Sequence, residues 1–212
     1  MTRESPKTKV SAIETSTAMV MTSVRHGLLT KLLHAGLLLS VLWQLAASGL
    51  VERPKASQPG NQFYEIHEIV GLVTLALVLL FWIWSAVRRR ETPFTSLFPW
   101  LSGRQLKAVA ADIGAHWAYL RRLRLPLSDI ETPPASAVHG VGLLTALAMA
   151  ATGAWLYTQS IPSGLILEIH KAVSNLMWAY VVGHAGLALV HQFTGHRVLQ
   201  QMFGSTSDAG QA

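Results

Sequence analysis

The chain contains no cysteine, and this absence excludes several kinds of site at once. Without thiols there is no disulfide, no thiolate-bound metal, no iron–sulfur cluster and no C-x-x-C-H attachment of a c-type haem. The sequence also lacks a phosphate-binding loop, a dinucleotide fingerprint and a nucleophile constellation, so nothing supports a hydrolase or an NAD-dependent enzyme. The softer metal ligands that remain are 9 histidines and 6 methionines.

Charge is sparse as well. Only 13% of the 212 residues are charged and half are hydrophobic, which is more apolar than an ordinary soluble domain. A net charge of +6 is compatible with nucleic acid or anionic lipid as a partner. The basic residues stand between apolar blocks rather than along one face, so we expect membrane lipid and no nucleic acid.

Four uncharged runs are long enough to cross a bilayer, whose core needs about 20 apolar residues in a helix. They are residues 32–50, 69–87, 137–157 and 172–190. Helices of soluble proteins seldom run so long without a charge, so a soluble helical bundle is the less favoured interpretation. The predicted fold is an all-α integral membrane four-helix bundle, with spans at about 27–50, 65–87, 137–157 and 169–191.

The basic residues indicate how these spans are oriented. Five Lys and Arg precede the first run, eight lie between the second and third, and Arg197 follows the fourth. The other side carries only Arg53, Lys55 and Lys171, so the positive-inside rule places both termini and the middle segment in the cytoplasm. A signal peptide ending near 46–48 is the alternative for the first run, although its 19 residues are long for a signal core.

The middle segment, residues 88–134, has turn signals at its prolines and helical periodicity between them. Apolar residues recur opposite basic ones over about 103–123, which predicts an amphipathic helix on the inner leaflet. The polar stretches 1–24 and 204–212 are expected to be mobile tails of a membrane domain at 25–203.

Four histidines lie inside the spans, where ionisable groups are costly and usually mark function. His170 and His184 are 14 residues apart on the fourth span. Their side chains therefore point about 40° apart on one helical face and are separated by about 21 Å along the axis. One helix presents two imidazoles at two depths, which suits two flat cofactors stacked along the membrane normal.

The residues that mark the outer boundary predict a partner for the first of these histidines. Glu65 and Glu168 both mark that boundary, and each is followed two residues later by a histidine, His67 or His170. We therefore expect His67 and His170 at one level, near the outside.

A similar count pairs the other two histidines. His184 lies 16 residues after Glu168, and His34 lies 18 residues before Glu52 on an oppositely directed helix. The difference of two residues corresponds to about 3 Å of rise. We expect His34 and His184 to form a second pair, nearer the cytoplasm.

Neutral imidazole is a common ligand of haem iron, so both pairs are candidate haem sites. A metal-handling or transport protein is the alternative, but such a site would need three or four ligands at one depth. A purely structural membrane subunit is a third possibility. The remaining histidines are interpreted as interfacial (His191), as a helix-end residue (His139) or as solvated (His26, His116 and His196).

The stretches "KLLHAGLLLSVLWQL", "YEIHEIVGLVTLALVLLFWIW", "HGVGLLTALAMAATGAWLY" and "EIHKAVSNLMWAYVVGHAGLALVH" together resemble the bacterial cytochrome b561 family. That family is similar to the cytochrome b subunits of nickel–iron hydrogenases. The resemblance covers about residues 25–203, and its specific part is the distribution of one, one, no and two histidines over the four spans. It implies two haem b groups, one ligated by His34 with His184 and the other by His67 with His170.

The same resemblance implies a place and an activity. It indicates a multi-pass protein of the bacterial inner membrane that moves single electrons between a quinone pool, with ubiquinone as a candidate, and another redox partner. Some family members resemble superoxide oxidases, and others connect a periplasmic enzyme to the quinones. The middle segment is longer than the linker of the family, so contacts at the inner face are expected to differ.

Overall fold

The computed structural model describes residues 26–88, 94–121, 133–193 and 198–203. Within these ranges the chain is helical apart from its connections, which hold a single isolated bridge between Lys55 and Gln58. The predicted tails, 1–24 and 204–212, lie outside the described residues. The elements, in chain order, are α2 (Leu28–Ala47), η1 (Ser48–Leu50), α3 (Gln62–Val87), η2 (Phe94–Leu97), η3 (Pro99–Leu101), α4 (Gly103–Arg121), α5 (Pro133–Tyr157), α6 (Gly164–Phe193) and α7 (Val198–Phe203).

Four of these helices are long and apolar enough to cross a membrane, which confirms the predicted all-α architecture with one extra helix. The segments are Leu28–Leu50, Gln62–Val87, Ser136–Tyr157 and Gly164–Phe193. Many of their large apolar side chains point away from the bundle, including Leu39 and Val182, which are 70% and 65% exposed. So much apolar surface needs a lipid environment, and the chain is therefore a multi-pass membrane protein.

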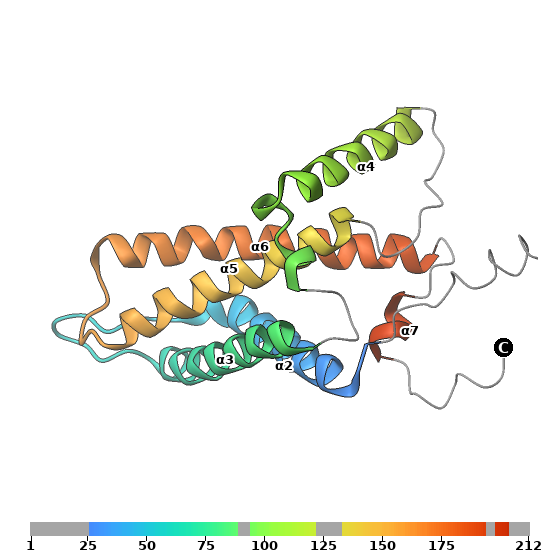
Figure 1. The fold of residues 1–212 in the computed structure, drawn as a ribbon. Helices are drawn as coiled ribbons and strands as arrows, with labels where there is room; N and C mark the ends of the chain where they lie inside the picture. The colour runs from blue at the N-terminus through green and yellow to red at the C-terminus, as the bar shows by residue number, and fades with distance from the viewer. Residues whose placement is uncertain (1–25, 89–93, 122–132, 194–197, 204–212) are drawn as a thin grey trace, which may run out of the picture.

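Each spanning helix packs against the next one, in the order α2, α3, α5 and α6. Figure 1 shows the α2–α3 and α5–α6 connections at one end of the bundle and α4 at the other end. Neighbouring spans are therefore antiparallel, as in an up-and-down four-helix bundle. We call the end with the two connections the outer end, because the charge rule predicts that it faces away from the cytoplasm.

Local side-chain chemistry explains the start of α3. The Asn61 side chain accepts a hydrogen bond from the backbone N–H of Tyr64 (2.9 Å) and so caps the helix. Its amide group also donates to the carbonyl of Leu50 (2.8 Å), which ties the end of the first span to the start of the second.

The fourth helix begins earlier than predicted. It starts at Gly164, whose φ of 75° lies in the left-handed region that glycine adopts without strain. The prediction placed the start of the span after Glu168, whereas the helix includes Glu168 and the four residues before it.

The buried core at the centre of the bundle is small and contains a residue from every span. Leu45, Val78, Ala146 and Met177 form a buried cluster, one residue from each of α2, α3, α5 and α6. Met177 lies between His170 and His184 on α6, and Leu45, Ala146 and Met177 also line a cavity at the outer end.

The segment η2–η3 packs on the bundle rather than serving as a plain turn. Leu97 and Phe98 are buried against Leu143, and the Phe98 ring stacks on Trp82 with 5.1 Å between centroids. Gly140 on α5 lies directly against the Leu97 backbone, where a Cβ would overlap the carbonyl. The middle segment is therefore anchored between α3 and α5.

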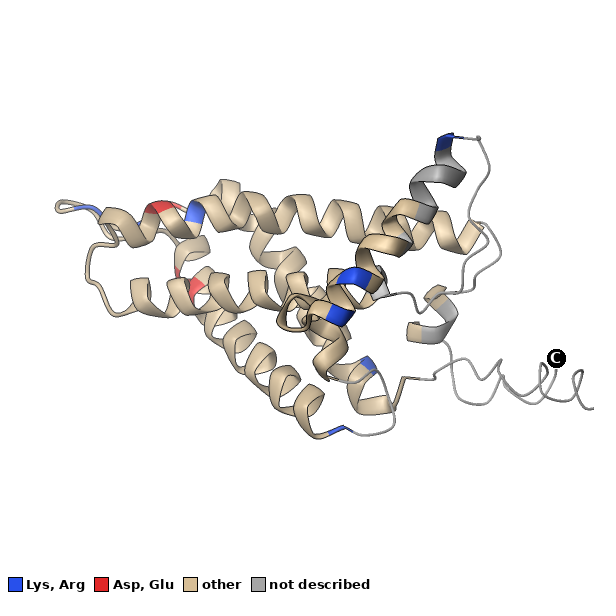
Figure 2. Cartoon of the chain, turned by 45° about the horizontal axis from the view of Figure 1, so that its top comes forward, with Lys and Arg blue, Asp and Glu red and all other residues tan. Residues whose placement is uncertain are grey.

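The extra helix α4 projects from the inner end of the bundle (Figure 1). It confirms the predicted helix at about 103–123, and its apolar residues Leu106 and Ile113 are about half exposed. Figure 2 shows acidic residues beside basic ones at the outer end, whereas the charged residues that it colours on α4 are basic. That α4 lies on the inner leaflet stays a prediction.

Candidate cofactor site

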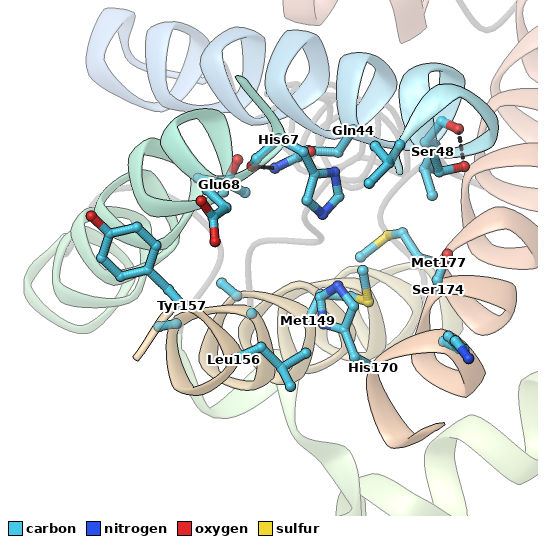
Figure 3. A pocket seen from close by; sticks show the side chains of 18 of the residues that line it. Gln44, Ser48, His67, Glu68, Met149, Leu156, Tyr157, His170, Ser174 and Met177 are labelled. Atoms are coloured by element: carbon cyan, nitrogen blue, oxygen red, sulfur yellow. Dashed lines mark hydrogen bonds between the residues drawn. The ribbon is translucent and has the colours of Figure 1, made fainter. Parts of the chain in front are cut away.

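The structure brings His67 of α3 and His170 of α6 together near the outer end. Their ring centroids are 6.2 Å apart and the ring planes are inclined by 83°. Figure 3 shows the two rings pointing toward each other from opposite walls of a cavity. Both side chains are partly buried, so the two imidazoles face an enclosed space rather than lipid.

The cavity between these rings has a volume of about 510 Å³, which lies within the range of small-molecule and cofactor sites. All four spanning helices and the two outer connections line it. Its wall is mainly apolar and includes the thioethers of Met149 and Met177, while Gly71 and Gly153 leave parts of the backbone uncovered. A flat apolar ligand would find room and little competition from water.

A residue of α5 forms a hydrogen bond with the ring of His170. Its Nδ1 is 2.8 Å from Thr152 Oγ1. The neighbouring Gly153 packs against the same ring, because a Cβ there would lie 3.3 Å from Cε1 of His170. The two consecutive residues position this imidazole.

His67 is positioned through its backbone instead. Gln44 of α2 donates a hydrogen bond from Nε2 to the carbonyl of His67 (2.8 Å), as the dashed line in Figure 3 shows. Nδ1 of His67 and Oε1 of Gln44 are buried and have no hydrogen-bond partner within the part of the chain that the structure describes. A buried orphan imidazole nitrogen is costly unless the ring has a further partner.

Charged side chains surround the outer mouth of the cavity. Lys171 pairs with Glu168 (2.8 Å) at an exposed position, and Arg53 donates to the carbonyl of Pro162 (3.2 Å). Arg53, Lys171 and Glu68 all line the cavity. The mouth therefore offers two cations next to an apolar interior, an arrangement that suits a ligand with an apolar body and anionic substituents.

The second predicted pair, His34 and His184, lies toward the inner end of the bundle. The two side chains are close enough to interact electrostatically. The His184 ring stacks on Tyr180 with 5.3 Å between centroids, and the His34 ring meets Phe203 of α7 at 6.3 Å. Each ring of this pair therefore has an aromatic side chain beside it.

Two of the other histidines, His139 and His26, lie near the second predicted pair. His139, interpreted from the sequence as a helix-end residue, has its ring 5.2 Å from that of His184. His26 is half-buried and interacts electrostatically with His34. The side chain of His116 and the whole of His196 lie outside the described residues.

Sequence reasoning missed the residues that hold the candidate ligands. Thr152 and Gln44 are polar residues inside apolar spans, which is the signal that a search limited to histidine overlooks. Thr152 lies five residues from the end of α5, and His170 lies six residues from the start of α6. Counting residues from the helix ends for polar residues as well as for histidines would have placed Thr152 and His170 at one depth.

The outer level presents two imidazoles, and at the inner level the ring of His139 lies 5.2 Å from that of His184. The described residues contain no group of three or more His, Asp or Glu side chains that could hold a metal ion together. A structural or catalytic zinc site uses three or four protein ligands.

The outer site fits a haem. Two imidazoles that were both to bind one metal ion, each through a nitrogen about 2 Å from it, would have ring centroids up to about 6 Å apart. The centroids of His67 and His170 are separated by 6.2 Å. The apolar wall, the glycines in it and the cations at its mouth suit the ring and the carboxylates of the same group.

A membrane bundle with two imidazoles facing each other across an apolar cavity defines a protein able to hold a flat metal cofactor between two helices. The family model described as prokaryotic cytochrome b561 matches residues 25–205, and the chain belongs to this family. A search of curated proteins and a search of solved structures each found no match. The protein is accordingly a transmembrane b-type cytochrome of electron transfer, and it binds haem b.

Proposed function

We propose that the chain holds two haems b, and that it moves single electrons between a quinone pool, with ubiquinone as the candidate, and a periplasmic redox partner or superoxide. The observation that carries this proposal is the pair formed by His67 and His170, whose rings face each other at 6.2 Å across the cavity. When bound between two histidines, haem supplies reversible one-electron redox chemistry.

In the outer site, His67 and His170 are the proposed iron ligands. Gln44 and Thr152 keep them in place through hydrogen bonds of 2.8 Å each. The apolar wall excludes water, and Arg53 and Lys171 at the mouth are the proposed partners of the haem carboxylates.

In the inner site, His34 and His184 are the proposed ligands. Tyr180 orients His184 by stacking on it with an interplanar angle of 9°. Because His170 and His184 are on one helix, the two sites are separated by about 21 Å of axial rise. Two sites at these depths let electrons cross most of the bilayer in short steps, from one face to the other.

Two kinds of redox protein remain open within this proposal: an electron-transfer subunit for a periplasmic enzyme, and a quinone-linked oxidoreductase that resembles the superoxide oxidases. Both place the outer site at the periplasmic face. They differ in whether the purified chain alone reduces quinone with superoxide.

The first test is a haem count on the full chain purified in detergent after expression with sufficient haem. Absorption spectra of the oxidised and dithionite-reduced protein, with a pyridine haemochrome assay, should give two b-type haems per chain. His67→Ala and His170→Ala should each reduce the count to one, as should His34→Ala and His184→Ala.

His191→Ala is a matched control, because it removes a histidine of the same helix that is not proposed to bind iron. It should keep both haems. A colourless wild-type protein would overturn the proposal, and two haems retained in His67→Ala and His170→Ala would overturn the assignment of the outer site. Quinone reduction by superoxide then separates the two kinds of redox protein.

A further inference from the structure

Thr152 makes three close polar contacts with a single hydroxyl group. Its Oγ1 is 2.7 Å from the carbonyl oxygen of Ala148 and 3.0 Å from that of Met149, both in the preceding turn of α5. The third contact, at 2.8 Å, is with Nδ1 of His170 on α6. All three distances are those of hydrogen bonds.

The position of the hydroxyl proton follows from these contacts. A hydroxyl has one proton to donate and two lone pairs that accept. Two oxygens 2.7 Å apart repel unless a proton lies between them, and the carbonyl of Ala148 cannot supply one. Thr152 therefore donates to its own helix, as Thr145 does to Val141 (2.9 Å) and Thr74 to Val70 (2.7 Å).

The imidazole must then be the donor in the contact between Thr152 and His170. A hydroxyl oxygen whose proton already points at a carbonyl can only accept from Nδ1–H. The Met149 carbonyl also lies beside this ring and, like every carbonyl, can only accept. The neutral His170 ring therefore carries its proton on Nδ1, and its Nε2 has a free lone pair.

We propose that Thr152 is a positioning residue that selects the Nδ1–H tautomer of His170 and so presents Nε2 to the haem iron. The inference rests on the proposed function, because it concerns a ligand of the outer haem. A hydrogen-bond acceptor at the ring nitrogen that does not bind the metal fixes the tautomer and orientation of a metal-binding histidine and raises its basicity. Gly153 also helps to position His170, because its lack of a side chain lets the ring approach the backbone of α5.

The two proposed ligands of the outer haem are thereby unequal. Nδ1 of His170 is hydrogen-bonded to Oγ1 of Thr152 (2.8 Å), whereas Nδ1 of His67 has no hydrogen-bond partner among the described residues. Removing one hydroxyl should therefore change a single ligand of a single haem.

The test uses the full chain with its haems, in detergent. Thr152→Val keeps the shape of the side chain and removes the acceptor, whereas Thr152→Ser keeps the acceptor. In Thr152→Val we expect the outer haem to pass to an excess of apomyoglobin about 10 to 100 times faster, in line with the usual loss of metal affinity on removing such a partner. The reduction potential of the same haem should rise, because a less basic imidazole stabilises ferric iron less.

Thr145→Val is the matched control, since it removes a buried hydroxyl that also bonds the preceding turn of α5 but is not proposed to touch a ligand. It should leave both haems unchanged, and Thr152→Ser should restore the wild-type potential and haem retention. The role of Thr152 would be overturned by an unchanged outer haem in Thr152→Val, or by equal effects of Thr152→Val and Thr145→Val. Two haems in the wild-type protein would still uphold the proposed function in that case. A wild-type chain without haem would overturn both.

Discussion

Gly142 of α5 lies against the ring of Tyr180 of α6 so closely that a Cβ at position 142 would overlap the phenol. The same tyrosine stacks on His184, with 5.3 Å between the ring centroids. A glycine in one helix therefore sets the position of a candidate iron ligand in another. The contact is relayed through an aromatic ring and needs no hydrogen bond.

Gly142→Ala should therefore disturb the inner haem and leave the outer one intact. The added methyl group has to displace Tyr180, and overpacking of this kind costs about 1–3 kcal/mol. We expect a lower occupancy or a shifted reduced band for one haem only, measured by pyridine haemochrome and redox titration. Gly114→Ala is the control, because a Cβ there has open space around it; an equal effect of both variants, or loss of the outer haem, would contradict the relay.

Of the two proposed haems, the outer one should have the lower reduction potential. Glu65 and Glu168 lie near the starts of α3 and α6, at its end of the bundle, and Glu68 lines its cavity. Negative charge favours the oxidised iron and so lowers the potential, whereas the described charges at the inner end are basic. Redox titrations of His34→Ala and His67→Ala variants, each keeping one haem, should show this order; the reverse order would sink the prediction.

Glu68 offers a finer test, because it lines the outer cavity. Glu68→Gln should raise the outer potential by about 20–60 mV, since a partly screened charge is worth about 0.5–1.5 kcal/mol and 59 mV corresponds to about 1.4 kcal/mol for one electron. Glu52→Gln, in the outer connection but not in the cavity wall, should change it less. The inner potential should stay where it is in both variants.

The contact between Gly140 and Leu97 predicts that the middle segment stabilises the bundle. Gly140→Ala would place a methyl group on the Leu97 carbonyl and force η2 away from α5. We expect a loss of about 1–3 kcal/mol, seen as a lower midpoint of thermal unfolding in detergent, and easier proteolysis within 88–103. An unchanged midpoint would show that the segment can shift without cost.

The natural lack of cysteine allows a direct test of whether α4 lies on the membrane. Leu106 and Lys107 are both exposed and point about 100° apart around the helix, Leu106 toward the apolar side of the amphipathic pattern and Lys107 toward the basic side. A spin label at Leu106→Cys should collide more with oxygen, and one at Lys107→Cys more with a water-soluble nickel chelate, in liposomes of anionic lipid. Equal accessibility at both positions would mean that α4 does not lie on the bilayer.

Much of the architecture of this protein can be predicted from regularities along its sequence. Apolar length identifies the four spans, and a rise of about 1.5 Å per residue assigns each histidine a depth. The count from Glu65 and Glu168 put His67 and His170 at one level, and the structure brings their rings to 6.2 Å. That they bind iron stays a prediction.

What the sequence by itself determined is therefore the membrane class, the number of spans and the depths of the histidines, because these depend only on helix geometry and on the cost of burying charge. Only the tertiary structure decided which side chains meet at a given depth. It packed α3 against α5 and not along α6, so that His67 and His170 face each other across a cavity. It also turned Thr152 toward His170 and Gly142 toward Tyr180, because lateral neighbours depend on how helices rotate and pack, which no count along the chain contains.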